Sequence, residues 1–115
     1  MITKNDMDQV FHALAHGTRR DILDHLRITP GLTVGGLAAH FDVSRNAVKN
    51  HISVLENARL VVSEKDGRTR RLYLNIIPIQ MIYDRWGDDY SQHWASNLTT
   101  IKYAAEQAAK KKDQA

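Results

Sequence analysis

Residues 37–61 constrain the fold of this chain more than any other segment, because they carry two helical patterns separated by only a few residues. They read LAAHFDVSRNAVKNHISVLENARLV. Ala38, Asp42 and Val48 fall where a helix-turn-helix needs a small residue, a turn residue and an apolar residue. We therefore expect two short helices joined by a tight turn at Asp42, because Asp tolerates left-handed backbone better than most residues.

The second of these helices has two chemically different faces. Ser44 is its predicted N-cap, and the helix runs to about Asn57. The apolar positions that repeat at core spacing are Val48, Ile52 and Leu55. The opposite face carries Arg45, Asn46, Lys49, Asn50 and Ser53. Arg and Lys donate to guanine in the major groove, and Asn pairs with adenine. Taken alone, this face fits a base reader and an ordinary solvated helix face equally well.

A β-hairpin is predicted directly after this helix. Strand patterns at 60–64 and 70–75 flank the tight-turn dipeptide Asp66-Gly67. Residues 44–71 hold seven basic and three acidic residues, against nine and ten in the rest of the chain. Such a patch is typical of a surface that contacts phosphates, although solvated loops also carry arginines. A basic hairpin after a helix-turn-helix is a wing, and the combination favours DNA binding.

The segment before residue 37 reads as helices. Helical spacing predicts a first helix over 7–15. A second helix follows, and Thr18 with Asp21 resembles the capping box that opens a helix. Thr33 is the expected N-cap of a short third helix.

A long helix is predicted at the other end of the chain. Pro78 suits the first turn of a helix, and an apolar stripe continues from it to Ala108. The predicted fold class is therefore mainly α with a β-hairpin wing, a winged helix-turn-helix with a long C-terminal dimerisation helix. Residues 1–109 are expected to form one domain, and 110–115 a disordered tail.

The element order and three phrases, FHALAHGTRRDILDHL, FDVSRNAVKNHISVLENARLV and DGRTRRLYLN, closely resemble the arsenic-repressor-type (ArsR) family of bacterial winged-helix repressors. The resemblance covers about residues 8–103. It implies a homodimer that binds double-stranded DNA at a palindromic operator, often in its own promoter. The recognition-helix positions that it implies are Ser44, Arg45, Asn46, Lys49, Asn50 and His51, and the wing positions are Lys65, Arg68, Arg70 and Arg71.

Three of these implied contacts have an alternative. His51 either donates to a phosphate or packs beneath the recognition helix. Arg70 and Arg71 lie inside a strand, where they would instead pack across the hairpin. Arg59 replaces the glycine that usually follows the recognition helix in the family, which leaves the backbone of that turn open.

The chain departs from the metal-sensing members of the family. Those members carry Cys-x-Cys in the third helix, whereas this chain has no cysteine. His12 and His16 have a ligand-capable spacing on one helix, but no nearby acid or thiol completes a site. Other metal sensors carry paired Asp/His and His/Glu ligands on the last helix, whereas here His93 is the one histidine there, with Asp84, Asp88 and Asp89 nearby in the sequence. The sequence is thus similar to the metal-independent branch, and we expect neither a metal nor another cofactor.

The apolar stripe of the last helix is longer than one small core can cover. It predicts a dimer interface that apolar residues of the first helix join. An intramolecular core and a pocket for an unknown small-molecule effector are the alternatives. The residues expected at the interface are Val10, Phe11, Leu14, Tyr83, Trp86, Tyr90, Trp94, Leu98 and Ile101.

Other classes of protein fit poorly. The chain has no glycine-rich phosphate loop, no cysteine and no serine with an evident histidine–acid pairing, so we do not expect an enzyme. No apolar run approaches the roughly 20 residues of a membrane span, and no signal peptide opens the chain, so we expect a cytoplasmic protein without a membrane partner. The predicted function is that of a sequence-specific transcriptional regulator, a repressor. The alternative is a winged-helix protein-interaction module that no longer reads DNA.

Overall fold

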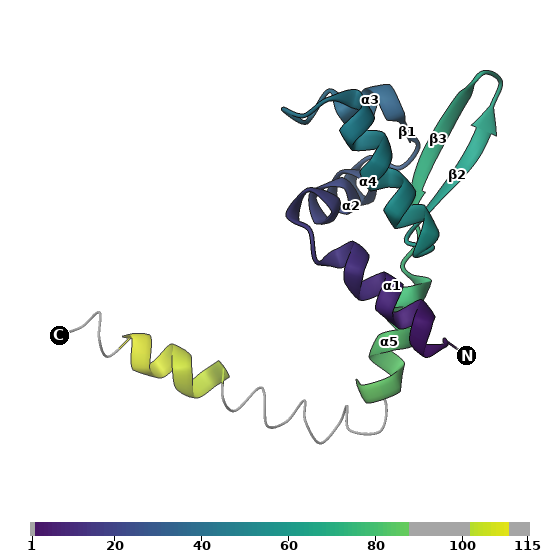
Figure 1. Cartoon of the computed structure of the whole chain (residues 1–115). Coiled ribbons are helices and arrows are strands. Elements are labelled where there is room, and N and C mark those ends of the chain that lie inside the picture. Colours follow the sequence, from purple (N-terminus) through teal and green to yellow (C-terminus); the bar gives the residue numbers. More distant parts are fainter. Residues whose placement is uncertain (1, 88–101, 111–115) are drawn as a thin grey trace. The chain divides into compact units, whose positions relative to one another are not determined.

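The computed structural model describes residues 2–87 and 102–110 (Figure 1). The chain divides into two compact units, Met1–Ile82 and Tyr83–Ala115. In chain order the elements are α1 (Lys4–Leu14), α2 (Gly17–Ile28), β1 (Leu32–Thr33), α3 (Val34–Ala38), α4 (Arg45–Asn57), β2 (Val61–Asp66), β3 (Thr69–Leu74) and α5 (Ile77–Gly87). Residues 102–110 are also helical. The mainly helical fold with a β-hairpin wing is confirmed, while the middle of the expected long final helix lies outside the described residues.

The first two helices begin at caps that the sequence patterns did not identify. Thr3 accepts the Asp6 N–H at 3.0 Å, and the Asp6 carboxylate accepts the Thr3 N–H at 3.3 Å. This capping box starts α1 at Lys4, before the predicted start of the helix. The prediction of Thr18 as the cap of α2 is wrong. His16 is the cap instead, because its Nδ1 accepts the Thr18 N–H at 3.2 Å.

The caps of the helix-turn-helix are confirmed. Thr33 Oγ1 accepts the Gly36 N–H at 3.0 Å at the start of α3, and Ser44 Oγ accepts the Ala47 N–H at 3.1 Å at the start of α4. These hydrogen bonds satisfy N–H groups that a helix start leaves unpaired. The expected left-handed backbone at Asp42 is wrong, because no described non-glycine residue except Arg59 has a positive φ.

Arg59 ends α4 with a φ of 63°. Its N–H donates to the Glu56 carbonyl at 2.9 Å, and the Leu60 N–H donates to the Leu55 carbonyl at 2.9 Å. This pattern is a Schellman motif, in which glycine is the usual residue at the left-handed position. An arginine there costs about 1–2 kcal/mol. Asn75 Nδ2 donates to the Arg59 carbonyl at 2.8 Å and helps to hold the turn. Arg59, whose backbone conformation the sequence did not determine, therefore ends the helix in the conformation that a glycine usually takes.

The wing is a three-stranded antiparallel sheet with the order β1-β3-β2. β2 and β3 pair along their lengths, and Gly67 occupies the turn between them with a φ of 63°. No sequence pattern indicated β1, because it has only two residues and becomes a strand by pairing Leu32 with Leu72 of β3. Figure 1 shows the β2–β3 hairpin extending past the helices of the first unit.

The core of the first unit lies between helices α1 to α4 and the base of the wing. Each of α1 to α4 contributes at least one fully buried side chain, and β3 contributes another. The largest of them are Val10, Ile22, Leu26, Leu37, Val48, Leu55, Leu60 and Leu72. Burial of a side chain of this kind contributes about 1.5–3 kcal/mol. This packing holds α4 with one face inward and leaves the opposite face available for binding.

Candidate nucleic-acid interface

The two faces of α4 are separated as the helical period predicts. Its buried residues are Val48, Ile52 and Leu55. The exposed residues of the other face are Arg45, Asn46, Lys49, Asn50 and Ser53. Within residues 2–87 and 102–110, none of these exposed side chains forms a hydrogen bond or an ion pair. Unpaired amide and cationic donors on a rigid helix are what the base edges of a major groove require.

Arg45 joins the surface of α4 to that of α3. A Cβ atom at Gly35 would lie 3.5 Å from Arg45 Nη2 and 3.8 Å from its Cζ, so the guanidinium rests against the backbone of α3. These distances are ordinary van der Waals contacts, so the guanidinium packs on this part of α3 without a close approach. Ser44, just before Arg45, uses its hydroxyl as the cap of α4. Both residues therefore lie at the start of α4, directly after the turn of the helix-turn-helix.

The inner face of the wing, which we define as the face toward α4, carries unpaired cations. Lys65 lies directly opposite Arg70 in the β2–β3 register. Arg70 lines a cleft together with Lys49, Ser53 and Glu56 of α4. Two like charges directly opposite each other destabilise a ladder, and neither cation has an ion-pair partner among the described residues. An anion bound in or beside this cleft would relieve that repulsion.

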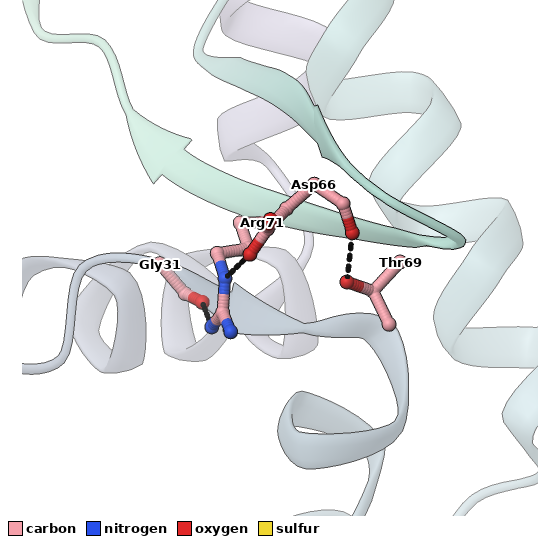
Figure 2. Close-up of polar contacts among 4 residues, drawn as sticks. All are labelled: Gly31, Asp66, Thr69 and Arg71. Atoms are coloured by element: carbon pink, nitrogen blue, oxygen red, sulfur yellow. Dashed lines mark hydrogen bonds and ion pairs between the residues drawn. The ribbon is translucent and has the colours of Figure 1, made fainter.

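The outer face of the wing neutralises its charge internally (Figure 2). Arg71 Nε donates to Asp66 Oδ2 at 2.8 Å, and Arg71 Nη1 donates to the Gly31 carbonyl at 3.0 Å. This hydrogen bond to the Asp66 carboxylate raises the pKa of Arg71. Thr69 Oγ1 donates to the Asp66 carbonyl at 2.7 Å and closes the turn. The alternative of packing across the hairpin is therefore confirmed for Arg71, whose guanidinium ties the wing to the loop before β1.

The tip of the wing adds one more free cation. Arg68 follows Gly67 in the turn and is exposed. In the part of the chain that the structure describes, its guanidinium has no hydrogen bond or ion pair. The wing thus presents three unpaired cations, which are Lys65, Arg68 and Arg70.

His51 lies on the flank of α4 that packs against the junction of α1 and α2. Its ring is 4.6 Å from the ring of His16 between centroids, and its Nδ1 is 3.5 Å from Arg19 Nη1. Burial lowers the pKa of His51, and the electrostatic effects of the neighbouring His16 and Arg19 lower it further. The structure shows this half-buried packing, while the contact with a phosphate remains a prediction.

Two arginines after α1 have a role that the sequence patterns did not indicate. Arg19 is 8% exposed, and it donates from Nε to the Ala13 carbonyl at 2.9 Å and from Nη2 to the His12 carbonyl at 3.0 Å. Arg20 Nη1 donates to the Leu14 carbonyl at 2.7 Å. These bonds satisfy carbonyls that the end of a helix leaves unpaired, and the positive charges suit that end of the helix dipole. The sequence feature that could have indicated this capping role is the Arg-Arg pair soon after the predicted end of the first helix.

The residues predicted at a dimer interface divide into three groups. Val10 is 1% exposed in the core of the first unit, and Leu14 packs against that core. Phe11 is 48% exposed, and Tyr83 and Trp86 are 58% exposed. Outside the described residues lie Tyr90, Trp94, Leu98 and Ile101. The three exposed aromatic side chains are apolar surface of the kind that association covers.

The histidines of the described residues do not form a metal centre. Across residues 2–87 and 102–110, no group of three or more His, Cys, Asp or Glu side chains is arranged to hold a metal ion. His25 and His40 stack with centroids 4.4 Å apart, and Phe41 meets His25 edge-on. His93 lies outside the described residues. In the same two ranges, no helix is long and apolar enough to cross a bilayer.

Known proteins share the segment that contains this surface. A family model described as a helix-turn-helix domain matches residues 14–64. The chain is 48% identical over 73 residues to the HTH-type transcriptional regulator Rv2034 of Mycobacterium tuberculosis, a match that covers 64% of this chain and 66% of that protein. It is 32% identical over 74 residues to the transcriptional repressor SdpR of Bacillus subtilis, covering 64% of this chain and 81% of that repressor.

A solved structure shows the same architecture over most of the chain. An ArsR-like transcriptional regulator from Rhodococcus sp. RHA1 matches with a TM-score of 0.66 and 31% identity, and the match covers 90% of this chain and 93% of that one. The fold, the helix-turn-helix segment and the wing therefore agree with one family. The chain belongs to the ArsR family of winged helix-turn-helix proteins, which are DNA-binding transcriptional regulators.

Proposed function

We propose that the chain is a homodimeric repressor that recognises a palindromic operator, including one in its own promoter. One observation carries this proposal. The exposed face of α4 and the inner face of the wing, which meet at the cleft that Lys49, Ser53 and Arg70 line, present donors and cations without a partner among the described residues. On the outer face of the wing, Asp66 pairs with Arg71. DNA offers base edges to the first surface and phosphates to the second. The name of the relative SdpR, a transcriptional repressor, supports the direction of regulation.

In this proposal α4 reads bases while the wing holds the backbone. Arg45 and Lys49 donate to guanine, and Asn46 and Asn50 pair with adenine. The hairpin is too short to read several bases, so its cations contact phosphates or the minor groove. These cations are Lys65, Arg68 and Arg70. Arg71 contributes by keeping the hairpin attached to the loop before β1.

A second copy supplies the second half of the operator. A two-fold axis places two recognition helices in successive major grooves, about 34–36 Å apart. The exposed aromatic side chains of Phe11, Tyr83 and Trp86 support an association of this kind, together with the apolar stripe that the sequence continues to Ala108. Repression then follows because the bound dimer occupies the promoter.

Footprinting of the full-length protein on the DNA upstream of its own gene tests the proposal. We expect protection of two half-sites one helical turn apart on one face of the duplex, in the presence of heparin at moderate salt. Changing Asn46 and Asn50 together to Ala should abolish this protection. Changing Asn5, an exposed amide on α1, to Ala is the matched control and should leave it intact.

Two results would contradict the proposal. Complete displacement of the protein from every DNA fragment by heparin would indicate a protein-interaction module. Protection of a single half-site by a monomer would contradict the homodimer and the palindrome, although the base-reading role of α4 would stand.

A further inference from the structure

We propose that Arg19 fixes the tautomer of His51, so that the neutral imidazole presents its Nε2–H as a hydrogen-bond donor to a DNA phosphate. In this arrangement His51 is the binding residue and Arg19 is a positioning residue that acts through it. The inference rests on the proposed function, because it adds one contact to the same DNA-binding surface.

The buried guanidinium determines which nitrogen of His51 carries the proton. Nε and Nη2 of Arg19 are bonded to carbonyls of α1, which hold the group in one orientation. Its Nη1 then lies 3.5 Å from His51 Nδ1. A guanidinium has donors only. Nδ1 must therefore be the acceptor, and the proton of a neutral His51 lies on Nε2.

The surroundings of His51 favour the neutral ring. The titratable and charged groups that face it are His16, from the cap of α2, and Arg19, from α2 itself. The His12 carbonyl of α1 accepts a hydrogen bond from Arg19. His16 also uses its Nδ1 as an acceptor, for the Thr18 N–H. Among the described residues, no carboxylate is one of the groups that act on His51, so none of them compensates an imidazolium.

The position of His51 suits a phosphate contact. It follows Asn50 of the exposed face by one residue, and its ring is partly exposed at the edge of α4. In the described residues, its Nε2 has no hydrogen-bond partner. A neutral donor differs from the lysines and arginines of this surface. It adds a hydrogen bond to a phosphate without adding a charge that would release counterions.

Long-range proton–nitrogen NMR spectra of the full-length protein without DNA test the tautomer. At neutral pH we expect His51 to be protonated on Nε2 only. Arg19→Lys should convert this single tautomer into a mixture. Arg20→Met is the matched control, because Arg20 also caps α1 but does not contact His51. A ring protonated on Nδ1, or on both nitrogens at neutral pH, would overturn the inference.

DNA-binding titrations of two His51 variants test the phosphate contact. They do not depend on the folding of a variant at the buried Arg19. The amide nitrogen of Gln reaches about as far as Nε2, whereas that of Asn reaches only as far as Nδ1. His51→Gln should therefore retain the affinity, and His51→Asn should weaken binding by about threefold to tenfold per half-site, the range of one uncharged hydrogen bond. The loss should be equal on the upstream duplex and on a random duplex, with an unchanged salt slope.

The two measurements distinguish failure of this inference from failure of the proposed function. A salt slope that falls by about 0.9 per half-site in His51→Asn would show a charged contact and overturn the inference. Equal binding by wild type and His51→Asn would overturn it as well. If the NMR spectra show the expected tautomer but the protein binds neither duplex, the proposed function and the phosphate contact are both refuted. The hydrogen bond between Arg19 and His51 would then be the one part of the inference that stands.

Discussion

Arg70 and Arg71 are neighbours on β3 with the same charge, and the structure gives them opposite surroundings. Arg70 lines the cleft beside α4 and has no ion-pair partner among the described residues, whereas Arg71 is bonded to Asp66 and to Gly31. Replacing either arginine by Ala removes one positive charge from the same strand. The two variants are therefore a matched test of which face of the wing contacts DNA.

The expected difference follows from counterion release. If Arg70 neutralises one phosphate per protomer, a dimer of Arg70→Ala loses two phosphate contacts. Each contact contributes about 0.9 to the slope of log affinity against log salt, so the slope should become shallower by about 1.8. Between about 50 and 200 mM salt, this difference changes the ratio of wild-type to variant affinity by about 12-fold. Arg71→Ala should leave the slope unchanged and lower the melting temperature, because it removes the ion pair and the bond to Gly31.

Fluorescence anisotropy over a series of salt concentrations measures both slopes. The titrations should use a duplex from the footprinted region and a random duplex of the same length. Phosphate contacts do not depend on sequence, so Arg70→Ala should change the slope on both duplexes alike. An equal change of slope for both variants, or a change for Arg71→Ala alone, would refute the assignment of the inner face as the side that contacts DNA.

Four further predictions concern other parts of the molecule. Asn50→Ala should cost about 1–3 kcal/mol per half-site on the operator and much less on random DNA, and equal losses would show that Asn50 contacts phosphate. Arg59→Gly should raise the free energy of unfolding by about 0.5 kcal/mol, because relief of the left-handed backbone exceeds the added entropy of the unfolded glycine; a lower melting temperature would contradict this balance. Trp94→Glu should produce a monomer with weakened operator binding, since a carboxylate buried at an interface is heavily penalised, and a monomeric wild type in light scattering at micromolar concentration would remove the basis for it. The pKa of His51 is lowered in the folded protein by burial, then by His16 and Arg19. The neutral His51 should therefore contribute fully to stability above the ordinary histidine pKa of about 6.5, and this contribution should be lost as the pH falls through the lower folded pKa. Thermal unfolding of His51→Gln, measured over the same pH range, should not show this loss.

The starts of α3 and α4 and the hairpin could be predicted because their signals are local. Thr33 and Ser44 each accept an N–H three residues further along the chain. The turn at Asp66-Gly67 needs only its own residues and the alternation on either side. The exposed face of α4 follows from the helical period once the apolar positions are known. These parts of the fold therefore rest on residues that are neighbours in the sequence.

Local sequence signals were insufficient where a residue takes a role that its type seldom has, or where an element is too short to show a pattern. His16 caps α2 with a ring nitrogen, while the pattern points to Thr18. Arg59 adopts the backbone of a glycine because the hydrogen bonds of the Schellman motif hold it there. β1 has too few residues to show any period, and it becomes a strand only because β3 lies beside it.

The sequence by itself determined that this chain has an amphipathic helix followed by a basic hairpin, since the helix, its caps and the turn depend on interactions within a few residues. Only the tertiary structure decided which cations remain free to bind DNA. Arg71 is held partly by a hydrogen bond to the Gly31 carbonyl, 40 residues earlier, and Arg19 meets His51, 32 residues later. Arg70 and Arg71 are alike in any count of charge, but the pleat of β3 directs them to opposite faces. Folding then brings α4 to one face and the partners of Arg71 to the other.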